Sequence, residues 1–240
     1  MSRVDLSARA RELGGSRRLF GELVGPEGDG PWPGVVMIHE VFGLDAVMTR
    51  QAEHLARLGY ATLALDLYSD GGARRCLTTM FRAVASGTGR PFADVEAGRR
   101  WLAGSPWCTG RVGVLGFCMG GAFALLCAPR GFDVAAVNYG QLPKDLDASL
   151  AGACPIVASY GGRDRSLRGA AARLEAALER AGIEHDVVEY PGAGHSFLND
   201  AMAGPVWLRP VLRVAGVRPD PQAATAAWAR VDAFFSAHLR

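Results

Sequence analysis

The sequence predicts a single α/β domain, residues 1–240, with a mostly parallel sheet and helices on both of its faces. The chain of 240 residues is long enough for one domain with a sizeable core and short for two. Short apolar runs alternate with segments of helical periodicity, which is typical of parallel strands joined by helices. The composition, 49% hydrophobic and 21% charged, is that of an ordinary globular protein.

Each predicted strand is a short apolar run, and each predicted helix carries apolar residues at helical spacing. In chain order the strands are 19–24, 35–38, 61–67, 111–116, 134–138, 156–160 and 187–190. The helices are 45–58, 93–102, 120–127, 167–181 and 223–239. The least regular stretches, 71–91 and 200–221, are predicted to be loops or lids. In such a sheet ligands bind beyond the carboxyl ends of the strands, so we looked for functional residues directly after strands.

The charge and the chain's N-terminal residues argue against several classes of partner. A formal net charge of +2, with basic residues scattered along the sequence, predicts no nucleic-acid or membrane partner. No signal peptide and no apolar run of membrane-spanning length is present, so a cytoplasmic location is expected. We expect a monomer or weak homodimer that acts on a small molecule.

The cysteines do not form a recognisable framework. They are odd in number, irregularly spaced and without a CxxC pair: Cys76, Cys108, Cys118, Cys127 and Cys154. Neither disulfides nor a zinc site is therefore predicted, and free thiols in a reducing compartment fit best. No metal or organic cofactor is expected.

Cys118 stands at the centre of a nucleophile elbow. The predicted strand 111–116 runs into Gly116-Phe117-Cys118-Met119-Gly120 and then directly into a helix. Small residues on both sides allow a sharp turn that exposes the central side chain, and the N-terminus of the following helix favours a thiolate. A buried structural cysteine is the alternative, and it is assigned to the other four cysteines, which lack this context.

His195 is the candidate base. A free thiol, with a pKa of about 8.5, is only slightly ionised at neutral pH and needs a base within hydrogen-bonding reach. Among five histidines, only His195 lies in a glycine-rich loop after a strand, in Pro191-Gly192-Ala193-Gly194-His195. His54 and His238 fall in helical patterns, and His185 precedes a strand.

Asp164 is the candidate acid that orients the base. It follows the predicted strand 156–160 and precedes a helix, which places it at the same sheet edge. There it would accept the second imidazole N–H and stabilise the imidazolium. Capping of the following helix is the alternative role.

The loop after the strand 35–38 is expected to complete the site. Acyl transfer needs two donors aimed at the developing oxyanion, and we predict the backbone N–H groups of Val41 and Met119. Glu40 in the same loop would place a carboxylate close to the thiol and could hold or receive its proton. The alternative for Glu40 is an exposed loop residue.

Four motifs together resemble the dienelactone hydrolase (carboxymethylenebutenolidase-like) family. They are His39-Glu40-x-Phe42-Gly43-Leu44, Gly116-Phe117-Cys118-Met119-Gly120-Gly121, Gly162-x-Asp164 and Gly194-His195-Ser196-Phe197. The resemblance, from about residue 34 to the last helix, implies an α/β-hydrolase fold with the triad Cys118, Asp164 and His195 in the order nucleophile, acid, base. It also implies that Glu40 pairs with the resting thiol and is released when substrate binds.

The resemblance also indicates where substrate binds. Dienelactone-cleaving relatives hold the substrate carboxylate with arginines, one of them four residues after the histidine, where this chain has Asn199. The other arginine would come from the region of Arg74, Arg75 or Arg82, and Phe42 is a further candidate contact. Because Asn199 departs from the family pattern, we expect activated esters or lactones as a class.

A thiolate leaves a tetrahedral intermediate more readily than an ordinary alkoxide, so esters with a stabilised leaving oxygen are favoured. The expected reaction is attack by Cys118, a thioester intermediate, and hydrolysis by water that His195 activates. Three alternatives remain open: a general carboxylesterase or thioesterase acting on neutral substrates, a non-catalytic ligand-binding protein on the same fold, and a redox role for Cys118.

Overall fold

The computed structural model describes all 240 residues and contains one eight-stranded sheet in the order β1-β2-β4-β3-β5-β6-β7-β8. The strands are β1 (Ser2–Asp5), β2 (Phe20–Val24), β3 (Trp32–Ile38), β4 (Ala61–Asp66), β5 (Cys108–Phe117), β6 (Val134–Asn138), β7 (Ile156–Gly161) and β8 (His185–Tyr190). Strand β2 pairs antiparallel with β1 on one side and with β4 on the other, and all other neighbours are parallel. The predicted mostly parallel α/β architecture is confirmed.

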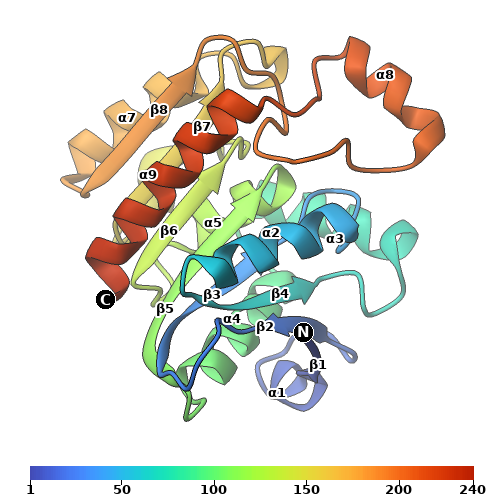
Figure 1. Cartoon of the computed structure of the whole chain (residues 1–240), viewed down its shortest axis with the longest axis vertical. Helices are drawn as coiled ribbons and strands as arrows, with labels where there is room; N and C mark the ends of the chain where they lie inside the picture. The colour runs from blue at the N-terminus through green and yellow to red at the C-terminus, as the bar shows by residue number, and fades with distance from the viewer.

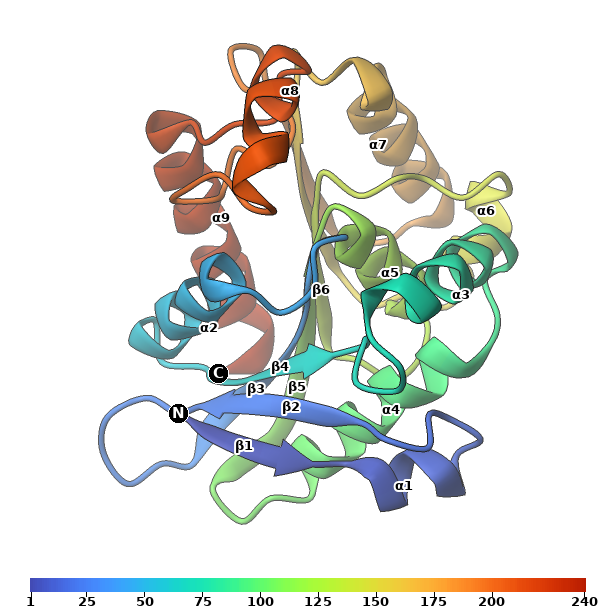
Figure 2. The same cartoon turned by 90° about the vertical axis from the view of Figure 1, so that its right-hand side faces the viewer.

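The helices cover both faces of the sheet (Figures 1 and 2). They are α1 (Ser7–Glu12), α2 (Ala46–Arg57), α3 (Ala73–Ser86), α4 (Arg90–Ala103), α5 (Met119–Cys127), α6 (Leu146–Leu150), α7 (Ala170–Ala181), α8 (Arg209–Val214) and α9 (Pro221–Leu239). In Figure 2, α2 and α9 lie on one side of the sheet, while α3, α4, α5 and α7 lie on the other. A contiguous core of 66 buried residues extends across both layers. None of the helices combines the length and apolar character needed to cross a bilayer.

The prediction of a loop or lid over 71–91 was wrong, because most of this segment is helix α3. Cys76, Met80 and Ala83 are buried at helical spacing, which fixes the helix against the core. The sequence signal was weak because the flanking residues, Gly72 and Gly87, cap the helix without a side-chain hydrogen bond. The other irregular segment, 200–221, contains the 3-10 helix Val206–Leu208, the short helix α8 and the first residue of α9.

Three glycines allow the start of α5 to approach the sheet closely. A Cβ at Gly116 would collide with the backbone of Gly120, and a Cβ at Gly120 would collide with the carbonyl of Ile38 in β3. A Cβ at Gly121 would lie 2.6 Å from the carbonyl oxygen of Asn138 in β6. The N-terminus of α5 is therefore wedged between the ends of β3 and β6, with Cys118 at the bend in a left-handed conformation, φ 55°.

We expect Gly116→Ala to destabilise the fold severely. The methyl group has no space to move into, since its neighbour is the backbone of Gly120, and overpacking of this kind costs about 3 kcal/mol or more. Urea denaturation of the variant should show a midpoint far below that of wild type. Gly152→Ala is the matched control: nothing lies within 4 Å of its Cβ, so only the cost of its positive φ of 76° remains. Equal stability losses in the two variants would contradict the close approach of Gly116 to the backbone of Gly120.

Candidate active site

The predicted catalytic residues meet at one edge of the sheet, although they come from four separate loops. Cys118 follows β5, Asp164 follows β7, His195 follows β8 and Glu40 follows β3. These strands are mutually parallel, so their carboxyl ends share an edge. The thiol of Cys118 is partly exposed, whereas Glu40 and Asp164 are buried.

Asp164 uses its two carboxylate oxygens for different purposes. Oδ2 pairs with Nδ1 of His195 at 2.5 Å. Oδ1 accepts hydrogen bonds from the backbone N–H and the hydroxyl of Ser166, at 3.0 and 2.6 Å. The two roles that the sequence left as alternatives, orienting the histidine and capping the following turn, are therefore both present.

The surroundings of His195 favour the imidazolium. Burial alone would lower the pKa of His195, but the hydrogen bond with Asp164, together with the neighbouring Cys118 side chain and the Asp164 charge, raises it to about 10. For Asp164, burial acts to raise the pKa, but the hydrogen bond and charge of His195 and the bonds from Ser166 lower it overall. This arrangement suits a thiolate–imidazolium pair with a carboxylate behind the imidazolium.

The lowered pKa of Asp164 implies a loss of stability in acid. A carboxylate whose folded-state pKa lies below its ordinary 3.8 stabilises the fold above that pH, and the contribution is lost as the pH falls through the folded-state pKa. Hydrogen bonds to a charged group contribute about 2 kcal/mol. Denaturation at pH 6 and pH 3 should therefore show wild type more stable than Asp164→Asn by about this amount at pH 6, with the difference shrinking at pH 3. A constant difference would show that the carboxylate charge does not contribute.

Glu40 is held from one side by neutral donors. Its Oε1 accepts hydrogen bonds from the hydroxyl of Ser196 at 2.9 Å and from the side-chain amide of Asn199 at 3.2 Å. Burial raises the pKa of Glu40, while the charge of His195 and these two hydrogen bonds oppose the increase. Glu40 is thus not the exposed loop residue of the alternative reading, since only 2% of it is exposed.

The predicted substrate contacts lie in different settings. Asn199 is buried and its amide is engaged with Glu40, so it supports the site from within. Phe42 is partly exposed, and its ring packs against the backbone of Gly204. Arg74 and Arg75 are exposed in the first turn of α3.

The oxyanion loop after β3 is fixed by residues that the sequence did not reveal. Tyr68 donates its hydroxyl hydrogen bond to the carbonyl of Val41 at 2.9 Å and packs against the ring of His39. His39 Nε2 accepts from the backbone N–H of Leu67, so Nδ1 carries the proton that bonds the carbonyl of Glu40. Neither the Val41 nor the Met119 N–H donates within the chain, which leaves both predicted oxyanion donors available.

Tyr139, directly after β6, lies beneath the catalytic residues. Its ring centroid is 5.1 Å from that of His195 and 5.6 Å from that of Phe197. The hydroxyl is fully buried without a well-formed hydrogen bond, and burial together with the charges of Glu40 and Cys118 raises the pKa of Tyr139 well above 10. The apolar ring therefore limits hydration beneath the imidazole and the carboxylate.

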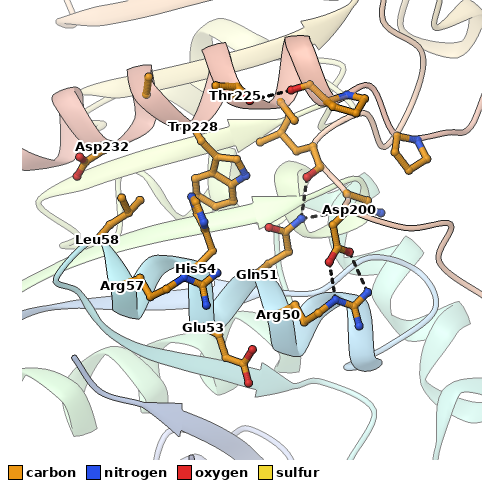
Figure 3. A pocket seen from close by; sticks show the side chains of 16 residues that line it. Arg50, Gln51, Glu53, His54, Arg57, Leu58, Asp200, Thr225, Trp228 and Asp232 are labelled. Atoms are coloured by element: carbon orange, nitrogen blue, oxygen red, sulfur yellow. Dashed lines mark hydrogen bonds and ion pairs between the residues drawn. The ribbon is translucent and has the colours of Figure 1, made fainter. Parts of the chain in front are cut away.

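A pocket of about 610 Å³ lies behind the site, between α2 and α9 (Figure 3). It shares Asn199 with the site but contains neither Cys118 nor His195. Along its wall Gln51 donates to the carbonyl of Leu198 at 2.8 Å, and Arg50 forms a two-point ion pair with Asp200. These contacts attach α2 to the loop that carries His195 and Asn199, so the pocket wall holds this loop in place.

No group of His, Cys, Asp and Glu side chains is arranged to bind a metal ion. The remaining thiols differ from Cys118 in their surroundings. Cys76, Cys108 and Cys127 are buried and Cys154 is partly exposed. Burial raises the pKa of Cys127 and of Cys154 to about 12, which keeps them protonated.

Comparison with known proteins decides the family. A model of the dienelactone hydrolase family matches residues 19–239 of the chain. The chain belongs to this family. A carboxymethylenebutenolidase of Pseudomonas putida is 31% identical over 198 residues, covering 77% of this chain and 83% of the relative.

Solved structures of family members have the same fold. A dienelactone hydrolase-like promiscuous phosphotriesterase from metagenomic libraries aligns with a TM-score of 0.80 at 24% identity, covering 100% of this chain and 98% of its own. A dienelactone hydrolase from Anabaena variabilis aligns with a TM-score of 0.71 at 23% identity and the same coverage. The resemblance and the fold predicted from the sequence motifs are both confirmed, and as a member of the dienelactone hydrolase family the protein is an ester or lactone hydrolase.

Proposed function

We propose that the protein hydrolyses activated carboxylic esters or lactones through a thioester on Cys118. The observation that carries the proposal is the Asp164–His195 pair at the sheet edge where Cys118 stands at the bend of the elbow, with Cys118 contributing to the raised pKa of His195. Cys118 is partly exposed, and it lies beside an imidazole whose pKa is raised to about 10, which is the arrangement that activates a cysteine nucleophile.

In the proposed reaction Sγ of Cys118 forms a bond to the carbonyl carbon, and the oxyanion accepts hydrogen bonds from Val41 and Met119. The intermediate collapses by breaking the bond to the leaving oxygen, which takes the proton from His195. Water then attacks the thioester while His195 accepts its proton. The carboxylic acid departs and the thiolate–imidazolium pair is restored. Glu40 bonds Ser196 and Asn199 beside this pair, and its predicted pairing with the resting thiol stays a prediction.

The side chains around Asn199 bear on whether the acyl group of the substrate is charged or neutral. The sequence resemblance implies an arginine at this position for dienelactone cleavage, whereas this chain has a neutral amide that donates a hydrogen bond to Glu40. The predicted arginines Arg74, Arg75 and Arg82 are all exposed on α3. This favours a second candidate, an esterase or thioesterase that acts on neutral acyl groups through the same triad.

A substrate panel tests both candidates. Wild type and Cys118→Ser are assayed side by side with dienelactone, aryl acetates and acyl thioesters, and the acylated enzyme is sought by intact-protein mass spectrometry. Turnover of lactone or aryl ester with an adduct on Cys118 supports the proposal. Turnover of neutral substrates alone selects the second candidate. Equal activity of wild type and Cys118→Ser would refute the thioester mechanism.

A further inference from the structure

Two segments flank the candidate active site on the side of the molecule that faces the viewer in Figure 2. One comprises residues 71–91 and contains α3, and the other comprises residues 201–219 and contains α8. We call them together the rim. Their surface differs in two independent ways from the rest of the protein.

The rim exposes apolar side chains. Apart from Met1, every large hydrophobic residue that is strongly exposed belongs to it: Phe81, Val206, Trp207, Val211 and Val214. Trp207 is 77% exposed and Val214 is 92% exposed. Val211 and Val214 lie three residues apart on α8, and Trp207 lies in the 3-10 turn Val206–Leu208 directly before it. Leu208 and Leu212 are partly buried. Such a concentration of exposed apolar side chains marks an interaction surface.

The rim is also purely cationic. It contains no Asp or Glu, and its arginines are Arg74, Arg75, Arg82, Arg90, Arg209, Arg213 and Arg218. Only Arg90 has an ionic partner, Asp70, which lies just outside the rim. The basic residues look scattered in a chain of net charge +2, but the fold places the two segments that carry these arginines on one side of the molecule.

We propose that the rim docks on the surface of an anionic lipid bilayer. Tryptophan side chains lie in the boundary between headgroups and acyl chains, the valines add apolar surface beside them, and arginines pair with the lipid phosphates. A second copy of the chain is a poorer occupant, because two cationic rims would repel each other. Nucleic acid would satisfy the arginines but would leave the valines of α8 exposed.

The rim is attached to the catalytic loops at both ends of the α8 segment. Gly204 packs against the ring of Phe42 in the oxyanion loop. At the other end, the backbone N–H of Arg218 donates to the carbonyl of His195 at 3.1 Å. Docking would therefore bring the lipid surface next to the site. If the protein hydrolyses esters as proposed above, this position of the site suits ester substrates that are dissolved in or carried by the bilayer.

Vesicle binding tests the proposal without relying on catalysis. The full chain is sedimented with vesicles of phosphatidylcholine alone and of phosphatidylcholine mixed with phosphatidylglycerol, at low and high salt. We expect binding only to the anionic vesicles, weakened by salt. Arg209→Gln/Arg213→Gln should weaken binding about 25-fold, as expected for two arginines at an anionic surface. Trp207→Ser should also weaken it. Arg173→Gln, an exposed arginine of α7 outside the rim, is the matched control and should bind as wild type does.

Three results would overturn the proposal. The first is equal binding to the two vesicle types, and the second is an equal loss of vesicle binding in the rim and control variants. The third is formation of oligomers or oligonucleotide complexes through Trp207 without any binding to vesicles. Hydrolysis of a water-soluble aryl ester is measured on the same samples. If the rim variants keep that activity but vesicles do not bind, the docking proposal fails alone. If vesicles bind but wild type hydrolyses no ester, the proposed function fails alone.

Discussion

Cys118→Ala is expected to reduce kcat for an aryl ester by at least about 10⁴-fold, because loss of a triad nucleophile removes the covalent route altogether. The fold should be retained. Alanine fits the same turn, and the contacts that wedge α5 between the strands come from glycines 116, 120 and 121. Circular dichroism and the urea midpoint should therefore match wild type within about 1 kcal/mol, as for substitutions away from core packing.

Chemical labelling of the thiols independently tests whether Cys118 is the nucleophile. Iodoacetamide should modify Cys118 before the other thiols and abolish activity in proportion, since burial raises the pKa of the remaining four. Cys154→Ala, which removes a partly exposed thiol elsewhere, is the control and should keep full activity. Activity that survives complete modification of Cys118 would exclude it as the nucleophile.

Asp164→Asn is expected to reduce kcat by about 10⁴-fold, the size of effect known when the acid of a triad becomes an amide. The carboxylate fixes Nδ1 of His195 as a donor and stabilises the imidazolium. An amide carries no charge to stabilise the imidazolium and does not fix Nδ1 as a donor, so the pKa of His195 should fall from about 10. Steady-state kinetics and an NMR titration of the imidazole measure the two effects.

Ser166→Ala separates the two roles of Asp164. It removes the hydroxyl that bonds Oδ1 but leaves Oδ2 paired with His195. We expect a small loss of stability, about 1 kcal/mol for one hydrogen bond, and nearly unchanged kcat. If Ser166→Ala were as inactive as Asp164→Asn, positioning of the turn would explain the effect better than the charge of the carboxylate.

Much of the fold followed from local patterns. Buried strands of a parallel sheet are short apolar runs, and the run 134–138 coincides with β6. The helix predicted at 45–58 is α2, and Asp45 caps it by accepting from the N–H groups of Val47 and Met48. Helix α3 was missed because a glycine stands at each of its ends and no side chain caps it. The sequence therefore lacks the Ser, Thr, Asp or Asn that usually marks the start of a helix.

The sequence by itself determined the elbow around Cys118, the loops that carry Asp164 and His195, and the family, because each depends on residues close together in the chain. Only the tertiary structure decided how Glu40 is held, since its donors Ser196 and Asn199 are 156 and 159 residues away. It also gathered the arginines and exposed valines of the rim on one side. Such contacts depend on strand order and packing, which bring distant residues together and which local periodicity does not encode.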